Sequence, residues 1–138
     1  MATTIRKKDY FKVGVADKPG EAARLLGALR DKGVNLLALT GFPRGRRRAQ
    51  IDFVPENTAA FKRALKQAGV DAGEKKTVFL VQGDDKVGAM AEILEKLGKA
   101  GINVTTVDAA SDGKGRFAAL LWVKAEDVSK SSKLLGAS

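Results

Sequence analysis

The apolar positions of this chain follow two periods, one typical of strands and one typical of helices. Between residues 10 and 16, Val13 and Val15 alternate with polar or small neighbours, which predicts a half-buried strand. Asp17 then offers an oxygen for a helix N-cap, and Pro19 suits the first turn. Apolar residues follow at helical spacing until Gly33, namely Ala22, Leu25, Leu26 and Leu29. The pattern therefore predicts a strand followed by a helix with one apolar face.

The same reading extends over the next forty or so residues. Residues 34–42 and 49–54 alternate like strands, and Pro43 and Gly45 between them favour a turn. A second helix is predicted over residues 56–68, with Gly69 closing it, and residues 70–74 form a short candidate strand. The predicted order is strand, helix, strand, strand, helix, strand.

This order occurs twice, with an offset of 68 residues. Asp17-Lys18-Pro19-Gly20 returns as Asp85-Lys86-Val87-Gly88, and Gly33-Val34-Asn35 returns as Gly101-Ile102-Asn103. A repeat of this length indicates a duplicated structural unit. The second copy is predicted to have strands over 77–82, 102–110 and 116–124 and helices over 87–100 and 126–134, with a turn at Asp112-Gly113.

We therefore expect an α+β protein of two ferredoxin-like βαββαβ modules, residues 1–74 and 75–138, each with two helices on one face of an antiparallel sheet. The last strand of the second module would have to come from residues 135–138, which are too few. That strand is expected to be missing or supplied from elsewhere.

The strand predicted over residues 116–124 is apolar on both sides, which is typical of a strand buried on both faces. The helices cover one side. The other side, formed by Ala118, Leu120 and Trp122, needs cover from the first repeat or from a second copy of the chain. We therefore expect the chain to form a homodimer through this face.

Composition places the chain among globular proteins, since 44% of its 138 residues are apolar and 30% are charged. No apolar run approaches the ~18 residues that span a bilayer, and no secretory signal is evident, so a cytoplasmic location is expected. The net charge of +9 comes from residues 1–70, which hold 15 Lys and Arg against 6 Asp and Glu. The densest cluster, Arg44, Arg46, Arg47 and Arg48, is either a solvated hairpin tip or a patch that attracts anions.

Two features of each copy resemble the ACT domain, over residues 9–70 and 76–135. One is the turn between the first strand and the first helix. The other is the glycine and asparagine that open the next strand. The resemblance implies a tandem ACT protein without an attached enzyme. Members of this family have a ferredoxin-like fold, bind amino acids or other small metabolites, and regulate enzymes or transcription. The partners implied are thus a small-molecule ligand, most simply an amino acid, and an enzyme under its control.

The resemblance also implies where a ligand binds. Asp17 and Asp85 supply a polar side chain, Gly20 and Gly88 permit close approach to the backbone, and Asn35 and Asn103 face the ligand. The predicted binding residues are Asp17, Lys18, Pro19, Gly20, Gly33, Asn35, Asp85, Gly88 and Asn103. Val87 departs from the pattern where Pro19 stands in the first copy, so the first loop is the more rigid and the preferred site.

Physical chemistry supports the same site, because a helix N-terminus attracts a carboxylate and Asp17 pairs with an ammonium group. Asn35 can both donate and accept hydrogen bonds. A structural explanation stays open beside it: Asp17 caps the helix, the glycines serve turn geometry, and Asn35 bonds neighbouring backbone.

Two other functions are weaker alternatives. An acylphosphatase-type enzyme holds phosphate beside its first strand, where this chain has acidic Asp17, Asp84 and Asp85, and the chain has no histidine or cysteine. An RNA-binding module shares the element order, but residues 48–53 contain one aromatic and an acid where such modules stack bases. We therefore predict no catalytic residue, metal or cofactor, and nucleic acid or membrane binding is not expected.

Overall fold

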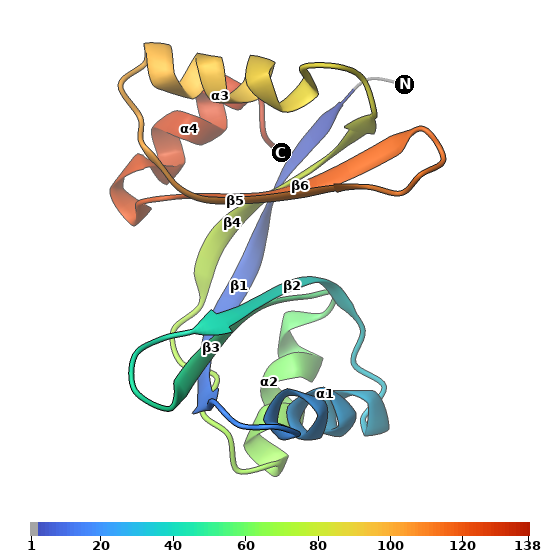
Figure 1. Ribbon diagram of the computed structural model, residues 1–138. Coiled ribbons are helices and arrows are strands. Elements are labelled where there is room, and N and C mark those ends of the chain that lie inside the picture. The colour runs from blue at the N-terminus through green and yellow to red at the C-terminus, as the bar shows by residue number, and fades with distance from the viewer. Residues whose placement is uncertain (1–2) are drawn as a thin grey trace. The chain divides into compact units, whose positions relative to one another are not determined.

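The computed structural model describes residues 3–138, and these residues fold into two compact units (Figure 1). The first module comprises residues 9–76. The second module comprises residues 77–138 together with residues 3–8 from the start of the chain. The boundary predicted between residues 74 and 75 lies two residues before the observed one, and residues 3–8 belong with the second unit rather than the first.

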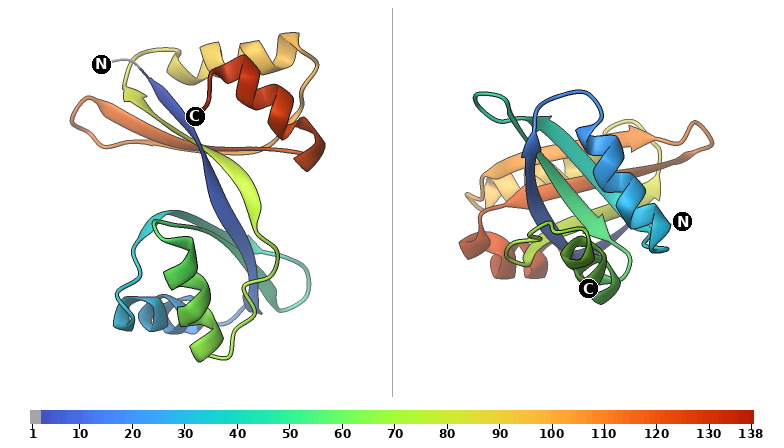
Figure 2. Two further views of the ribbon diagram at one scale, coloured as in Figure 1. Left: turned by 180° about the vertical axis from the view of Figure 1, so that it is seen from behind. Right: turned by 90° about the horizontal axis from the view of Figure 1, so that it is seen from below.

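The first module has helices on one face of an antiparallel sheet. Its strands are the later part of β1 (Thr4–Ala16), β2 (Leu36–Pro43) and β3 (Arg48–Pro55), in the order β2-β3-β1. Helices α1 (Glu21–Asp31) and α2 (Thr58–Gln67) cover one face of this sheet (Figure 2). Apolar residues at alternate strand positions and at helical spacing therefore meet in one core.

That core is built around three phenylalanines. The ring of Phe61 from α2 stacks on Phe11 at a centroid distance of 5.1 Å and contacts Phe53 at 5.5 Å. All three side chains are fully buried. Burial of each such ring stabilises the fold by roughly 1.5–3 kcal/mol relative to exposure, so these rings are the main anchor between α2 and the sheet.

The second module repeats this arrangement. Its strands are β4 (Lys76–Asp84), β5 (Val104–Ser111) and β6 (Arg116–Val123), and its helices are α3 (Ala89–Lys99), the short 3-10 helix η1 (Ala125–Asp127) and α4 (Val128–Leu135). The predicted inner face of β6 is confirmed, since its alternate residues join the core: Phe117, Ala119, Leu121 and Val123. The α+β fold with two ferredoxin-like modules is as the sequence predicts.

The missing strand of the second module comes from the N-terminal part of β1. In the order β1-β4-β6-β5, residues 4–8 lie beside β4, and Ile5 packs against the second core. The Lys7 N–H donates to the carbonyl of Ser138 at 2.9 Å, and the Ser138 N–H donates to that of Ile5 at 3.1 Å. Arg6 Nη2 donates to Gln82 Oε1 at 2.5 Å. Residues 136–138 form no strand of their own.

The strand predicted over residues 70–74 is wrong, because these residues have no strand conformation. Gly69 and Gly73 both have positive φ, which interrupts an extended backbone. The carboxylate of Asp71 accepts a hydrogen bond from the Gly73 N–H at 2.9 Å, a local turn that competes with strand pairing. Val70 and Ala72 nevertheless pack against the first core.

The face of β6 that is predicted to bind a second copy is largely buried in the single chain. Leu120 is 6% exposed and Trp122 is 4% exposed, and only Ala118 is exposed. A homodimer through this face stays a prediction. No helix among residues 3–138 is long and apolar enough to cross a membrane.

Candidate ligand-binding site

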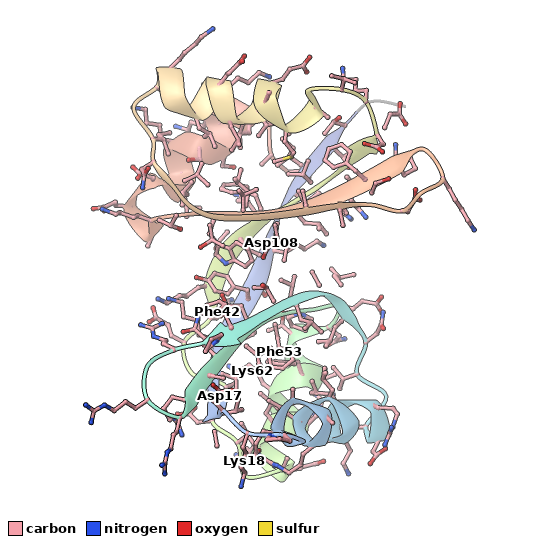
Figure 3. The ribbon with its side chains drawn as sticks, in the orientation of Figure 1. Asp17, Lys18, Phe42, Phe53, Lys62 and Asp108 are labelled. Carbon is pink, nitrogen blue, oxygen red and sulfur yellow. The ribbon has the colours of Figure 1, made fainter. Side chains whose placement is uncertain are left out.

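A cavity of about 340 Å³ opens in the first module between the start of α1 and the hairpin of β2 and β3. Four segments contribute to its wall: the end of β1 with the following loop, the first turns of α1, the end of β2 and the start of β3. The lining residues discussed below are Val15, Asp17, Lys18, Glu21, Ala22, Leu26, Leu39, Gly41, Phe42, Ala49, Gln50 and Ile51. Asp17, Lys18 and Phe42 are labelled in Figure 3.

The loop between β1 and α1 is fixed by its own backbone. The Asp17 N–H donates to the carbonyl of Arg47 at 2.8 Å, and the Lys18 N–H donates to that of Ala16 at 3.0 Å. Gly20 has a φ of 89° and is the N-cap of α1, so the conformation there requires glycine. The loop therefore presents the start of α1 to the cavity.

The prediction that Asp17 caps this helix is wrong. The N-cap is Gly20, and no side chain accepts a hydrogen bond from the first turn of α1. The Glu21 N–H donates to the carbonyl of Lys18 at 3.4 Å. Because the N–H groups of Ala22 and Ala23, which follow it, have no partner within the helix, they are available to an anion. Among the described residues, the carboxylate of Asp17 has no hydrogen bond or ion pair either, so it is available to a cation.

Glu21, the other acid of the cavity, is already engaged. Its carboxylate lies 3.1 Å from Arg24 Nη2 and 3.5 Å from Lys18 Nζ. The hydrogen bond from Arg24 lowers the pKa of Glu21 below its ordinary value, so the side chain stays ionised at neutral pH. Asp17 is consequently the carboxylate that a bound ammonium group would meet first.

Apolar side chains form most of the remaining wall. Val15 and Ile51 belong to the first core, and Leu26 packs against it from α1. Leu39 on β2 is 45% exposed, and its pairing with Phe53 places it on the face of the sheet that carries the first core. It is the part of the wall that a ligand would cover. Phe42, which pairs with Gln50, belongs to the opposite face.

Two further residues set the depth and polarity of the cavity. A Cβ added at Gly41 would lie 3.6 Å from the Ile51 side chain, an ordinary contact, so the absence of a side chain there leaves open space. Gln50 is buried, accepts a hydrogen bond from Arg44, and donates to Asp52 at 2.7 Å. Its amide is thus committed to neighbours.

The structure brings together only some of the predicted binding residues. Asp17 and Lys18 line the cavity, and Pro19 and Gly20 lie in the same loop. Gly33 has a φ of 70° and follows the other end of α1. Asn35 precedes β2, whereas the β2 residues of the cavity begin at Leu39, about 13 Å further along an extended strand.

The side chain of Asn35 has a structural partner. Its Nδ2 donates to Glu56 Oε2 at 3.2 Å, and its carbonyl accepts from the Glu56 N–H at 3.0 Å. These bonds join the start of β2 to the residue that follows β3. They agree with the structural explanation of Asn35 more closely than with contact to a ligand in this cavity.

The predicted residues of the second copy take equivalent backbone positions. The Asp85 N–H donates to the carbonyl of Gly115 at 2.9 Å, and Gly88 is the N-cap of α3 with a φ of 79°. Val87, in the place of Pro19, is fully exposed. Asn103 is exposed and precedes β5. The second loop thus repeats the shape of the first.

Sequence reasoning missed the part of the cavity that β2 contributes, Leu39, Gly41 and Phe42. A signal for it is present in the sequence, because a glycine inside a strand pattern commonly marks a place where a ligand or another backbone comes close. Large apolar residues that flank such a glycine on an edge strand indicate a wall rather than a core.

The remaining chemistry of the described residues is limited. No group of three or more His, Cys, Asp or Glu among residues 3–138 has the arrangement of a metal site. Phe53, the aromatic residue of β3, is fully buried, so this strand offers no aromatic surface on which a base could stack.

Comparison with known proteins agrees with this fold. Residues 10–68 match the model of the ACT domain. Protein BT0572 from Bacteroides thetaiotaomicron is similar in structure, with a TM-score of 0.79 and 16% identity over 97% of this chain and 88% of that one. The ligand-free regulatory subunit of aspartate kinase from Thermus thermophilus has a TM-score of 0.66 and 17% identity over 99% and 95% of the two chains.

The regulatory subunit of aspartate kinase from Thermus flavus has a TM-score of 0.62 and 18% identity, over 99% of this chain and 95% of that one. At such identities the likeness concerns the fold. No curated protein is significantly similar to this chain in sequence.

Proposed function

This chain is built from two ACT-type modules, and we propose that it is a regulatory protein that binds an amino acid in the cavity of the first module. The observation that carries the proposal is the pairing of an unengaged carboxylate, Asp17, with the uncapped start of α1 on one cavity wall. A zwitterion offers an ammonium group to the first and a carboxylate to the second.

The size of the cavity supports this class of ligand. A volume of about 340 Å³ lies at the lower end of the usual range of ~300–1,000 Å³ for small-molecule sites, which suits a ligand as small as an amino acid. The names of the structural neighbours, regulatory subunits of aspartate kinase, support a regulatory role without catalysis. An enzyme under the control of this protein is the partner we propose.

A thermal-shift screen of the full chain against the twenty amino acids tests the proposal. A ligand at 100 times its dissociation constant stabilises the folded protein by roughly 2.7 kcal/mol, which is a clear rise in Tm. If no amino acid raises the Tm, the proposed function is wrong.

The variant Asp17→Asn then tests the ammonium partner. Since Asp17 does not cap α1, its replacement leaves the fold intact, but it removes the charge that pairs with the ligand. Calorimetric titration should show affinity reduced by about 1–3 kcal/mol, the contribution of a charge-assisted hydrogen bond. Asp85→Asn, the equivalent change in the second copy, is the matched control and should leave the affinity unchanged.

Self-association is a further part of the proposal. Because Leu120 and Trp122 are buried, the surface we now favour is the backbone edge of β2, which lies at the end of the strand order and pairs with β3 alone. Sedimentation at micromolar concentration checks it: a homodimer is expected, and a monomer would remove this part. The cytoplasmic location stays a prediction from the sequence.

A further inference from the structure

The cavity in the first module has a polar side and an apolar side. The groups that we propose bind the zwitterion, Asp17 and the start of α1, lie in one loop at one side. The remaining wall is formed by aliphatic side chains from β1, α1, β2 and β3. These are Val15, Ala22, Leu26, Leu39, Ala49 and Ile51.

The polar side chains nearest to this wall are already bonded to other residues. Glu21 at the start of α1 is held by Arg24 and Lys18, and Gln50, on the opposite face of β3 from Ile51, accepts from Arg44 and donates to Asp52. A hydroxyl, amide or charged group on a ligand would lose its water without gaining a free partner there. An apolar group would lose only contact with water, which is favourable.

The exposure of Leu39 points in the same direction. Leu39 pairs with Phe53 and so lies on the face of the sheet that carries the first core, and it leaves more than a third of its surface in solvent. A ligand with an apolar side chain would cover this surface, whereas a polar side chain would leave it without a complementary group.

From these observations we infer that the ligand is an amino acid with an apolar side chain, which lies against Leu26, Leu39 and Ile51. The inference rests on the proposed function and narrows it to one ligand class. The ammonium and carboxylate groups hold every amino acid in the same way, so selection among amino acids comes from the apolar wall.

Calorimetric titration of the full chain with pairs of similarly shaped amino acids tests the inference. Valine is compared with threonine, and leucine with asparagine, because each pair differs mainly in polarity. We expect the apolar member to bind about 10- to 100-fold more tightly, the discrimination an apolar pocket gives against such a neighbour.

Substitutions on β2 locate the binding site. Gly41→Val adds an apolar side chain inside the cavity, and we expect it to abolish binding of valine and leucine. The backbone at Gly41 does not have positive φ and the added Cβ makes ordinary contacts, so the fold should persist. Leu39→Ala, at an exposed position, removes part of the apolar contact with the ligand. We expect leucine binding to weaken about tenfold, the lower end of the range for such a loss.

Leu37→Ala is the matched control. Leu37 lies on the same strand, is also exposed, and does not line the cavity, since it falls at the irregularity between Leu36 and Ala38. Its replacement should leave leucine affinity unchanged.

The possible results distinguish a failure of the inferred ligand class from a failure of the proposed function. Tighter binding of threonine or asparagine than of valine or leucine overturns the inference and leaves the proposed function standing. Equal affinity of Gly41→Val and the unmodified protein for leucine also overturns it, because the ligand then binds elsewhere. Absence of binding for all twenty amino acids removes both the inference and the proposed function.

Discussion

The two modules share a backbone but differ in the side chains that surround the start of their first helix. Elements α1 and α3, β2 and β5, and β3 and β6 are related by the same offset of 68 residues. Gly20 and Gly88 both begin their helices with positive φ and no side-chain cap. Whatever distinguishes the two copies is therefore in the side chains.

The side chains at the cavity positions change in both directions between the copies. Ala22, Gly41 and Ala49 correspond to the larger Met90, Ala109 and Phe117, whereas Val15, Leu39 and Ile51 correspond to the smaller Gly83, Val107 and Ala119. Phe117 is part of the second core and Met90 packs against it. We therefore place the proposed ligand site in the first copy.

Residues 3–8 reinforce this difference. Gly83, which corresponds to Val15, has no room for a side chain, since a Cβ there would lie 2.5 Å from Thr3 Oγ1 and 3.1 Å from Phe117 Cε1. The second copy thus uses the place of Val15 to accept the N-terminal strand.

Deletion of residues 1–8 should produce the largest effect, because it removes a strand and Ile5 from the second module. We expect amide hydrogens of residues 77–138 to lose protection from exchange, while those of residues 10–67 keep it. Hydrogen-exchange mass spectrometry makes the measurement. Equal protection of both modules in the truncated chain would show that the borrowed strand is dispensable.

Phe117→Ala is expected to have the next largest effect. Removal of a buried ring leaves a cavity and lowers the free energy of unfolding by about 3–5 kcal/mol. Urea denaturation measures this loss. The change does not touch the first module, so amino acid affinity of the folded protein should persist, and a loss of affinity would contradict the division of roles.

Ala22→Met gives the first copy the side chain of the second. Ala22 is exposed, so stability should change little, but the longer side chain narrows the cavity. We expect leucine affinity to fall at least tenfold, or about 1.4 kcal/mol. Met90→Ala is the reverse change and should leave that affinity unchanged in the same calorimetric titration.

The smallest predicted effect concerns the two β-hairpins. In the second, the backbone N–H groups of Lys114 and Arg116 donate to Asp112 Oδ1, which lowers the pKa of this carboxyl. The first hairpin has Arg44 in the same position.

A lowered pKa in the folded state means that the stabilisation is present above pH 3.8, the ordinary value for Asp, and is lost as the pH falls through the folded value. Acidification should therefore loosen residues 112–116 before residues 44–48, observed as earlier changes in their NMR signals. Asp112→Asn should remove the pH dependence. Simultaneous changes in both hairpins would contradict the assignment.

Much of the fold was predictable because local pattern and tertiary packing agree. The helix of α2 begins at an asparagine cap, with Asn57 Oδ1 accepting from the Ala60 N–H, and its periodic residues Phe61, Ala64 and Leu65 are buried as predicted. Because the sequence repeats, the helices and strands of the second copy could be predicted from those of the first.

The first half of β1 was not predictable from local pattern. Arg6, Lys7 and Lys8 give it no apolar alternation, and its strand conformation depends on Gln82 and Ser138, which lie far along the chain. The cavity was predicted in part, because Asp17 and Lys18 lie in a recognisable loop. Leu39 and Phe42 reach it only through the pairing of β2 with β3.

The division of β1 between the modules has a consequence for synthesis of the chain on the ribosome. Residues 4–8 are made before the rest of both modules, but Gln82 and Ser138, which hold them, emerge much later. Domains generally fold as units while the chain is being made, so the first module can form while this short basic segment has no partner. The second module becomes complete only when residues 4–8 meet Gln82 and Ser138.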